Sequence, residues 1–273
     1  MELSHLPFFC LMMTFASLWI HRSTWLWGSF LSLTFILAIT TGIAQLFSLV
    51  ILALFFGIFW ILKTPIEGPK RHFLTLLAIG LAALVQFHLS PGFCNWNVSA
   101  AFWVNLDKPL MGLFPLVFLV VLCQTRDDWI KVGLKAVPLT LVAIFGLATL
   151  ALWTGIIDWQ LKLPSHFLLR IFTNLFLVVI PEEAFFRGFL QREISQQIGP
   201  KLFSKTAGII GSSLVFTLFH LNWGASPAIL AFVFLASILY GSIYEMSKFL
   251  EGSILCHFSI NLLHMLLFSY HAA

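Results

Sequence analysis

Long runs of apolar residues, separated by short polar or turn-forming stretches, dominate the chain. A helix needs about 20 apolar residues to cross the hydrocarbon core of a bilayer, because each residue adds about 1.5 Å of length. By that measure the pattern predicts ten candidate membrane-spanning helices. Their approximate ranges are 6–21, 25–41, 43–62, 73–89, 109–123, 134–154, 166–192, 206–221, 226–245 and 252–270.

The apolar run from Trp25 to Leu62 is too long for one span. It makes two spans only if the chain turns tightly near Thr41 and Gly42. Several other runs are short for a full crossing, and no internal repeat stands out. We therefore expect an all-α, polytopic transmembrane helical bundle of about 8–10 spans.

Composition supports a membrane environment. Hydrophobic residues make up 60% of the chain and charged residues only 10%, whereas about 25% of a typical soluble domain is charged. The net charge of +4 is not concentrated in basic runs with interleaved aromatic residues, so we expect no nucleic-acid partner. The four cysteines lack CxxC spacing, which argues against a disulfide framework or a cysteine metal site.

The distribution of Lys and Arg predicts an orientation, because cytoplasmic loops carry an excess of both residues. With the N-terminus outside, only Lys108, Lys162 and Arg170 fall on the exterior side. We then expect both termini to face the exterior of a prokaryotic plasma membrane, with 90–105 as an exterior loop. The predicted interior set is Arg22, Lys63, Lys70, Arg71, Arg126, Lys131, Lys135, Arg187, Arg192, Lys201, Lys205 and Lys248.

Ionisable residues at mid-membrane depth are concentrated in the last four predicted spans. A charged residue at the bilayer centre costs roughly 2.5–3.5 kcal/mol on insertion scales, so such residues commonly mark a functional site. We expect a buried polar site in these helices, and we divide the chain into N-terminal transmembrane helices, 1–164, and a membrane core that carries the polar site, 165–273. The residues concerned are Glu182, Glu183, Arg187, His220, His257 and His264.

The stretch PEEAFFRGFL, Pro181 to Leu190, has an informative spacing. Glu183 and Arg187 are four residues apart with the acid first, which favours an ion pair on one helical face. Glu182 is rotated by about 100° from Glu183, so it meets a different environment. Pro181 interrupts the hydrogen-bond ladder just before the two glutamates. The two carboxylates can therefore differ in protonation behaviour.

Two later segments repeat the four-residue spacing. Phe216 and His220 share one helical face, and His257 and Asn261 share another. Counting along each helix from its predicted cytoplasmic end brings these residues and Glu182 to overlapping depths near mid-bilayer. The spacing is thus compatible with one buried polar site.

Three motifs follow one another on separate predicted helices within about 80 residues: Glu182-Glu183-xxx-Arg187, Phe216-xxx-His220 and His257-xxx-Asn261. Their order resembles that of the CPBP family, the CAAX-processing and bacteriocin-processing intramembrane endopeptidases. The resemblance covers roughly residues 165–270.

The resemblance implies roles for four residues. Glu182 and His220 would activate a water molecule, while His257 and Asn261 would stabilise the oxyanion. These roles suit amide hydrolysis, which needs a base near the water and donors aimed at the developing negative charge. No cofactor is required by this mechanism.

Three further residues would support the site without touching the reacting atoms: Glu183, Arg187 and Phe216. We interpret Glu183 and Arg187 as an ion pair that fixes the helix, although Glu183 can also contribute to catalysis directly. Tyr240 and His264 lie outside the three motifs, and we interpret them as structural or interfacial.

Two other functions stay open at this point. Glu182, His220 and His257 form a His₂Glu set, which is a known catalytic zinc constellation, although HExxH is absent. A non-proteolytic scaffold or transporter would use the same charged residues as a proton relay or ligand site. For the endopeptidase, we expect a membrane-anchored protein or peptide as substrate, cleaved near its C-terminal tail or anchor.

Overall fold

A computed structural model describes residues 3–99, 102–199, 203–221 and 226–270. Lys201, one of the predicted interior lysines, lies outside these ranges. The architecture is all-α, as predicted, with two small antiparallel two-stranded sheets. The chain forms two compact units: Met1–Val120 with Leu175–Phe185, and Val121–Asn174 with Phe186–Ala273. The boundary predicted near residue 164 stays a prediction.

In the described residues, the first unit contains the α-helices α1 to α5 and the helical segment Leu175–Phe185. α1 packs on α2, α3 packs on α4 and α5, and α4 packs on α5. The tight turn predicted near Gly42 is confirmed, since α2 ends at Thr40 and Gly42 has a φ of +77°, which glycine adopts without steric cost. The helices are α1 Leu6–Ile20, α2 Thr24–Thr40, α3 Ser48–Leu62, α4 Pro69–Gln86 and α5 Leu110–Phe118.

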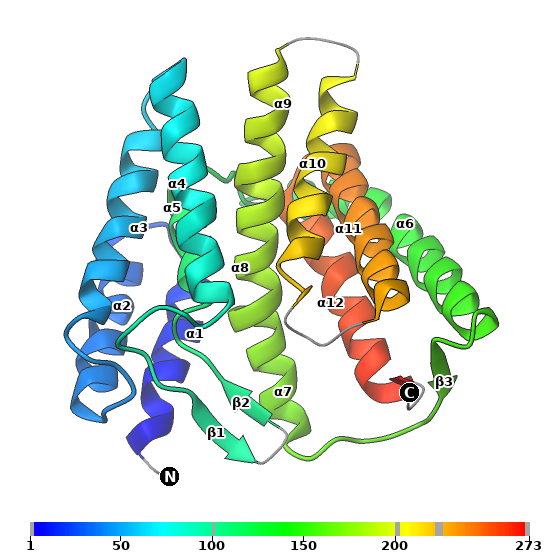
Figure 1. Cartoon of the computed structure of the whole chain (residues 1–273), viewed down its shortest axis with the longest axis horizontal. Helices are drawn as coiled ribbons and strands as arrows, with labels where there is room; N and C mark the ends of the chain where they lie inside the picture. The colour runs from blue at the N-terminus through cyan, green and yellow to red at the C-terminus, as the bar shows by residue number, and fades with distance from the viewer. Residues whose placement is uncertain (1–2, 100–101, 200–202, 222–225, 271–273) are drawn as a thin grey trace. The chain divides into compact units, whose positions relative to one another are not determined.

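The connection from α4 to α5 includes residues 90–105, which were expected as an exterior loop, and it contains two short paired strands. β1, Trp96–Ser99, pairs antiparallel with β2, Phe102–Val104 (Figure 1). Trp96 is buried, and its ring lies 5.2 Å from that of Phe8 on α1. Tryptophan, valine and phenylalanine favour such pleated, half-buried positions.

α5 is shorter than the span predicted at 109–123. It contains nine residues and is therefore about 14 Å long. Pro115 lies inside it and lacks an amide proton, which weakens continuation of the helix. Arg22 stabilises its end, because one guanidinium nitrogen donates to the carbonyls of Leu116 at 2.7 Å and Val120 at 2.8 Å.

The second unit is a helical bundle with a small sheet. α12 packs on α6 and α11, and α10 packs on α9 and α11 (Figure 1). α6 begins earlier than predicted, because Thr125 and Asp128 form a capping box at its start. The elements are α6 Arg126–Trp153, β3 Ile157–Trp159, α7 Phe167–Thr173, α9 Arg192–Ile198, α10 Ser204–Leu218, α11 Pro227–Ser247, α12 Leu250–Leu267 and β4 Phe268–Tyr270.

Three helices in the described part of the chain are long and apolar enough to cross a membrane: α6, α11 and α12. Three more apolar helices, α1, α2 and α3, contain 15, 17 and 15 residues. Together with the composition, these helices make the chain an integral membrane protein. The predicted orientation of the termini stays a prediction.

A continuous helical stretch carries the two glutamates. α7 leads into a π-helical segment, Asn174–Val179, then α8, Ile180–Glu183, then a second π-helical segment, Ala184–Gln191, and finally α9. Pro181 cannot donate a backbone hydrogen bond, and wide π-helical turns, which are frequent at functional sites, flank its short α-helical segment. Within this stretch, the segment Leu175–Phe185 belongs to the first unit and the residues on both sides of it belong to the second.

Candidate functional site

Glu182 lies in the first unit and is almost completely buried, with 1% of its surface exposed. Lys108, which directly precedes Pro109 and α5, places its Nζ 2.6 Å from Glu182 Oε1. α5 packs directly on α8. Gly112 makes this approach possible, because a β-carbon on Gly112 would overlap the backbone of Pro181. A glycine on one helix thus brings a lysine to the carboxylate on the other.

Lys108 is itself held by its neighbour Asp107, a buried residue. Asp107 Oδ1 accepts the backbone N–H of Lys108 at 2.8 Å. The second oxygen, Oδ2, accepts the hydroxyl of Ser90 at 3.1 Å and lies 3.2 Å from His88 Nδ1. The backbone from which the Lys108 side chain extends is therefore anchored, through Asp107, to the start of the α4–α5 connection.

Glu183 is also fully buried in the first unit. Arg187 belongs to the second unit, so the predicted Glu183–Arg187 ion pair stays a prediction. Within its own unit, Arg187 is fully buried and donates to the Ser237 hydroxyl at 3.1 Å and the Ser237 carbonyl at 3.3 Å. Its guanidinium carbon lies 5.1 Å from the Phe216 ring centroid and 5.6 Å from that of Tyr240, distances at which cations interact with aromatic faces.

His220 follows α10 and is fixed by Phe216. Its Nδ1 lies 2.7 Å from the Phe216 carbonyl oxygen, and the two rings are 4.4 Å apart. A carbonyl oxygen can only accept a hydrogen bond, so Nδ1 carries the proton. In the neutral ring Nε2 is then the basic nitrogen, which suits a residue that orients or deprotonates water.

His257 on α12 contacts two aromatic rings. Tyr240 on α11 stacks on it with a centroid distance of 4.5 Å and an interplanar angle of 12°. Phe216 approaches with a centroid distance of 5.9 Å and an interplanar angle of 74°. Helices α10, α11 and α12 thus jointly set the plane of the His257 ring.

Asn261 lies one turn beyond His257 on the same face of α12. Its side-chain amide donates to Asn174 Oδ1 over 3.5 Å. Asn174 begins the first π-helical segment and belongs to the second unit. This contact was not predicted, because the two residues are 87 positions apart in the sequence.

The structure brings four predicted site residues into one aromatic group in the second unit: Arg187, Phe216, His220 and His257. Tyr240, interpreted from sequence as structural or interfacial, is a buried member of the same group. Its only sequence signal is a hydroxylated aromatic residue inside an apolar helix. Within the described residues of either unit, no group of three or more His, Cys, Asp or Glu side chains is arranged to hold a metal ion.

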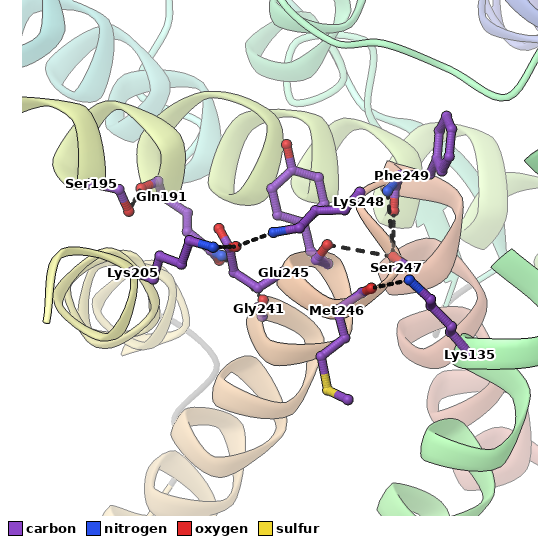
Figure 2. A network of polar contacts seen from close by, with 11 residues as sticks. Lys135, Gln191, Ser195, Lys205, Gly241, Glu245, Met246, Ser247, Lys248 and Phe249 are labelled. Atoms are coloured by element: carbon purple, nitrogen blue, oxygen red, sulfur yellow. Dashed lines mark hydrogen bonds and ion pairs between the residues drawn. The ribbon is translucent and has the colours of Figure 1, made fainter. Parts of the chain in front are cut away.

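Contacts near the end of α11 fix the stretch that carries Arg187 (Figure 2). Gln191 donates from its side-chain amide to the Gly241 carbonyl at 3.1 Å.

Three lysines contact the last turn of α11 or its end. Glu245 forms ion pairs with Lys248 at 2.8 Å and with Lys205 at 3.7 Å. Lys135 reaches the Met246 carbonyl at 3.2 Å. The three lysines all belong to the predicted interior set and gather around the last turn of α11.

Residues 164–263 match the model of the family described as Type II CAAX prenyl endopeptidase Rce1-like. The matched range contains all three sequence motifs and is less than half of the chain. The resemblance predicted from the motifs is therefore confirmed for this segment, which is similar to intramembrane endopeptidases of the CAAX type. A search of curated proteins and a search of solved structures each found no match.

Proposed function

We propose that the chain is an intramembrane endopeptidase that hydrolyses a peptide bond of a membrane-associated protein by a metal-independent, glutamate-based mechanism. The observation that carries this proposal is the grouping of His220 and His257 around Phe216, inside the segment that is similar to type II CAAX prenyl endopeptidases. A buried group of this kind suits hydrolysis, because a low dielectric strengthens both the base and the oxyanion donors.

In the proposed reaction, Glu182 accepts a proton from a water molecule that His220 orients through Nε2. The water oxygen forms a bond to the carbonyl carbon of the substrate, and the carbonyl oxygen becomes an oxyanion. The Asn261 amide and the His257 ring donate hydrogen bonds to that oxyanion. The carbon–nitrogen bond then breaks, and the proton held by Glu182 passes to the leaving amine.

The substrate class follows from the setting. Many large apolar side chains are exposed on the helices, as suits a chain embedded in a bilayer. We therefore propose that the scissile bond belongs to a protein or peptide that is itself held at the bilayer. We propose a cleavage site near a C-terminal tail or anchor, including the tail that follows a prenylated cysteine. That tail is the kind of substrate named for the similar family.

The test compares the C-terminal peptides of membrane proteins from host cells that express wild type, Glu182→Gln or Glu67→Gln at equal levels. Glu67 is an exposed carboxylate in the α3–α4 connection and serves as the matched control. We expect a defined set of unprocessed precursors only with Glu182→Gln. An identical peptide set in all three strains would refute the endopeptidase and favour a scaffold or transporter.

A second experiment, with a chelator, tests the zinc alternative. In that alternative, Glu182, His220 and His257 would hold the metal. Membranes from the wild-type strain are treated with a strong zinc chelator before the precursor is added. We expect processing to continue unchanged. Loss of processing that zinc alone restores would replace the glutamate mechanism with a metalloprotease.

A further inference from the structure

Lys108 belongs to none of the three motifs and lies outside the range that matches the family. It nevertheless places its ammonium 2.6 Å from Glu182. We infer that Lys108 is a positioning residue for the proposed reaction: its ammonium keeps Glu182 ionised and fixes the direction of its oxygens. This inference rests on the proposed function, in which Glu182 must accept a proton.

The electrostatic argument starts from burial. An ionised carboxylate in an apolar interior is costly and takes up a proton unless a charge or hydrogen bonds compensate it. The Lys108 side chain is 12% exposed and that of Glu182 is 1% exposed, so little water screens the pair. A protonated carboxylic acid already carries a proton and no longer acts as a base toward water. The ammonium therefore preserves the form of Glu182 that can react.

The geometric argument starts from the backbone. Lys108 lies in the turn that leads into α5, and Gly112 lies one helical turn further on. Gly112 fixes how closely this region approaches Pro181, the residue before Glu182. On the other side, the Asp107 carboxylate fixes the Lys108 backbone by accepting the Lys108 N–H. Both ends of the ion pair are thus attached to backbone that has little freedom to move.

A purely structural ion pair would have a different signature. Such a pair would hold α5 to α8, and its loss would lower stability and the amount of folded protein, while each folded molecule would process precursor at the wild-type rate. A positioning role instead predicts that loss of the charge at residue 108 protonates Glu182 and lowers the rate per folded molecule. The protonation can be observed without any substrate.

The experiment uses the full chain reconstituted in lipid vesicles at neutral pH, as wild type, Lys108→Met, Lys108→Arg and the double variant Lys108→Met/Glu182→Gln. Infrared spectroscopy follows the carbonyl stretch of a protonated carboxylic acid. We expect this band to appear in Lys108→Met and to be absent from the other three proteins. A Lys108→Met spectrum without the band would overturn the inference.

Processing in host cells supplies the second measurement. The precursors that accumulate with Glu182→Gln serve as substrates. We expect Lys108→Met to lower their processing rate per folded molecule by about 10²-fold or more, the usual size of a lost acid–base contribution. Lys108→Arg should recover most of that loss, and the exposed Lys70→Met should match wild type. Wild-type processing in Lys108→Met would also overturn the inference. If Glu182→Gln itself processes normally, the proposed function fails, while the infrared result still decides the state of the pair.

Discussion

The ring of Tyr240 lies nearly parallel to the ring of His257, 4.5 Å away. Stacked aromatic pairs contribute about 0.5–1.5 kcal/mol beyond the area they bury. We expect Tyr240→Leu to slow precursor processing by up to about tenfold, since the histidine would lose one of the rings that orient it. Tyr240→Phe retains the stack and should process at nearly the wild-type rate. Equal rates in Tyr240→Leu and wild type would show that the stack does not orient His257 for the reaction.

Gly112 should be the glycine least tolerant of a side chain in the first unit. A β-carbon there would overlap backbone atoms of Pro181, which cannot rotate away. We expect Gly112→Ala to lower the free energy of unfolding by about 1–3 kcal/mol, as for other overpacked sites. Gly80 on α4 has open space around it, so Gly80→Ala should be neutral or slightly stabilising. Thermal unfolding in detergent micelles measures both, and equal midpoints would contradict the close approach of α5 and α8.

Ser237 compensates the charge of Arg187 within the second unit. Its hydroxyl accepts a guanidinium hydrogen bond at 3.1 Å, and both residues are fully buried. We expect Ser237→Ala to reduce the free energy of unfolding by about 1.5–3 kcal/mol, the range for hydrogen bonds to charged groups. The hydroxyl of Ser242 on the same helix donates to the Ile238 carbonyl one turn away. Ser242→Ala is the matched control and should change the unfolding midpoint much less.

Asn261 is the proposed oxyanion donor whose removal leaves the histidines untouched. We expect Asn261→Ala to lower the processing rate by about 10²-fold or more with normal membrane insertion, the usual effect of removing one such donor. Asn174→Ala removes only the partner of a 3.5 Å hydrogen bond and should have a much smaller effect. A rate in Asn261→Ala that equals the rate in Asn174→Ala would exclude the donor role.

Local periodicity predicted the parts of the site that lie on one helix. His257 and Asn261 share a face of α12, because an α-helix repeats every 3.6 residues. Phe216 and His220 also meet, as their spacing predicts, although His220 lies in the turn directly after α10. The same reasoning located most helices, since an apolar run of sufficient length has few alternatives to a helix in a bilayer.

Contacts between distant segments were beyond such reasoning. Nothing in the local pattern around Lys108 pairs it with Glu182, and the positive-inside rule assigned it only to the exterior side. The approach depends on Gly112, whose importance appears only when Pro181 is placed beside it. The stacking of Tyr240 on His257 was beyond such reasoning for the same cause, because it becomes visible only when α11 is placed beside α12.

α12 is anchored at both ends. Near its start, Glu251 accepts the backbone N–H of Cys123 at 2.7 Å. At its other end, β4 pairs with β3, and the amides of Gln160 and Lys162 bond the carbonyls of Leu267 and Leu266. A helix tied in this way is among the last segments to open locally. We expect its amides to exchange with deuterated solvent more slowly than those of α10. In the proposed endopeptidase, α12 would then hold His257 and Asn261 in place, and local opening would occur first in the helices around it.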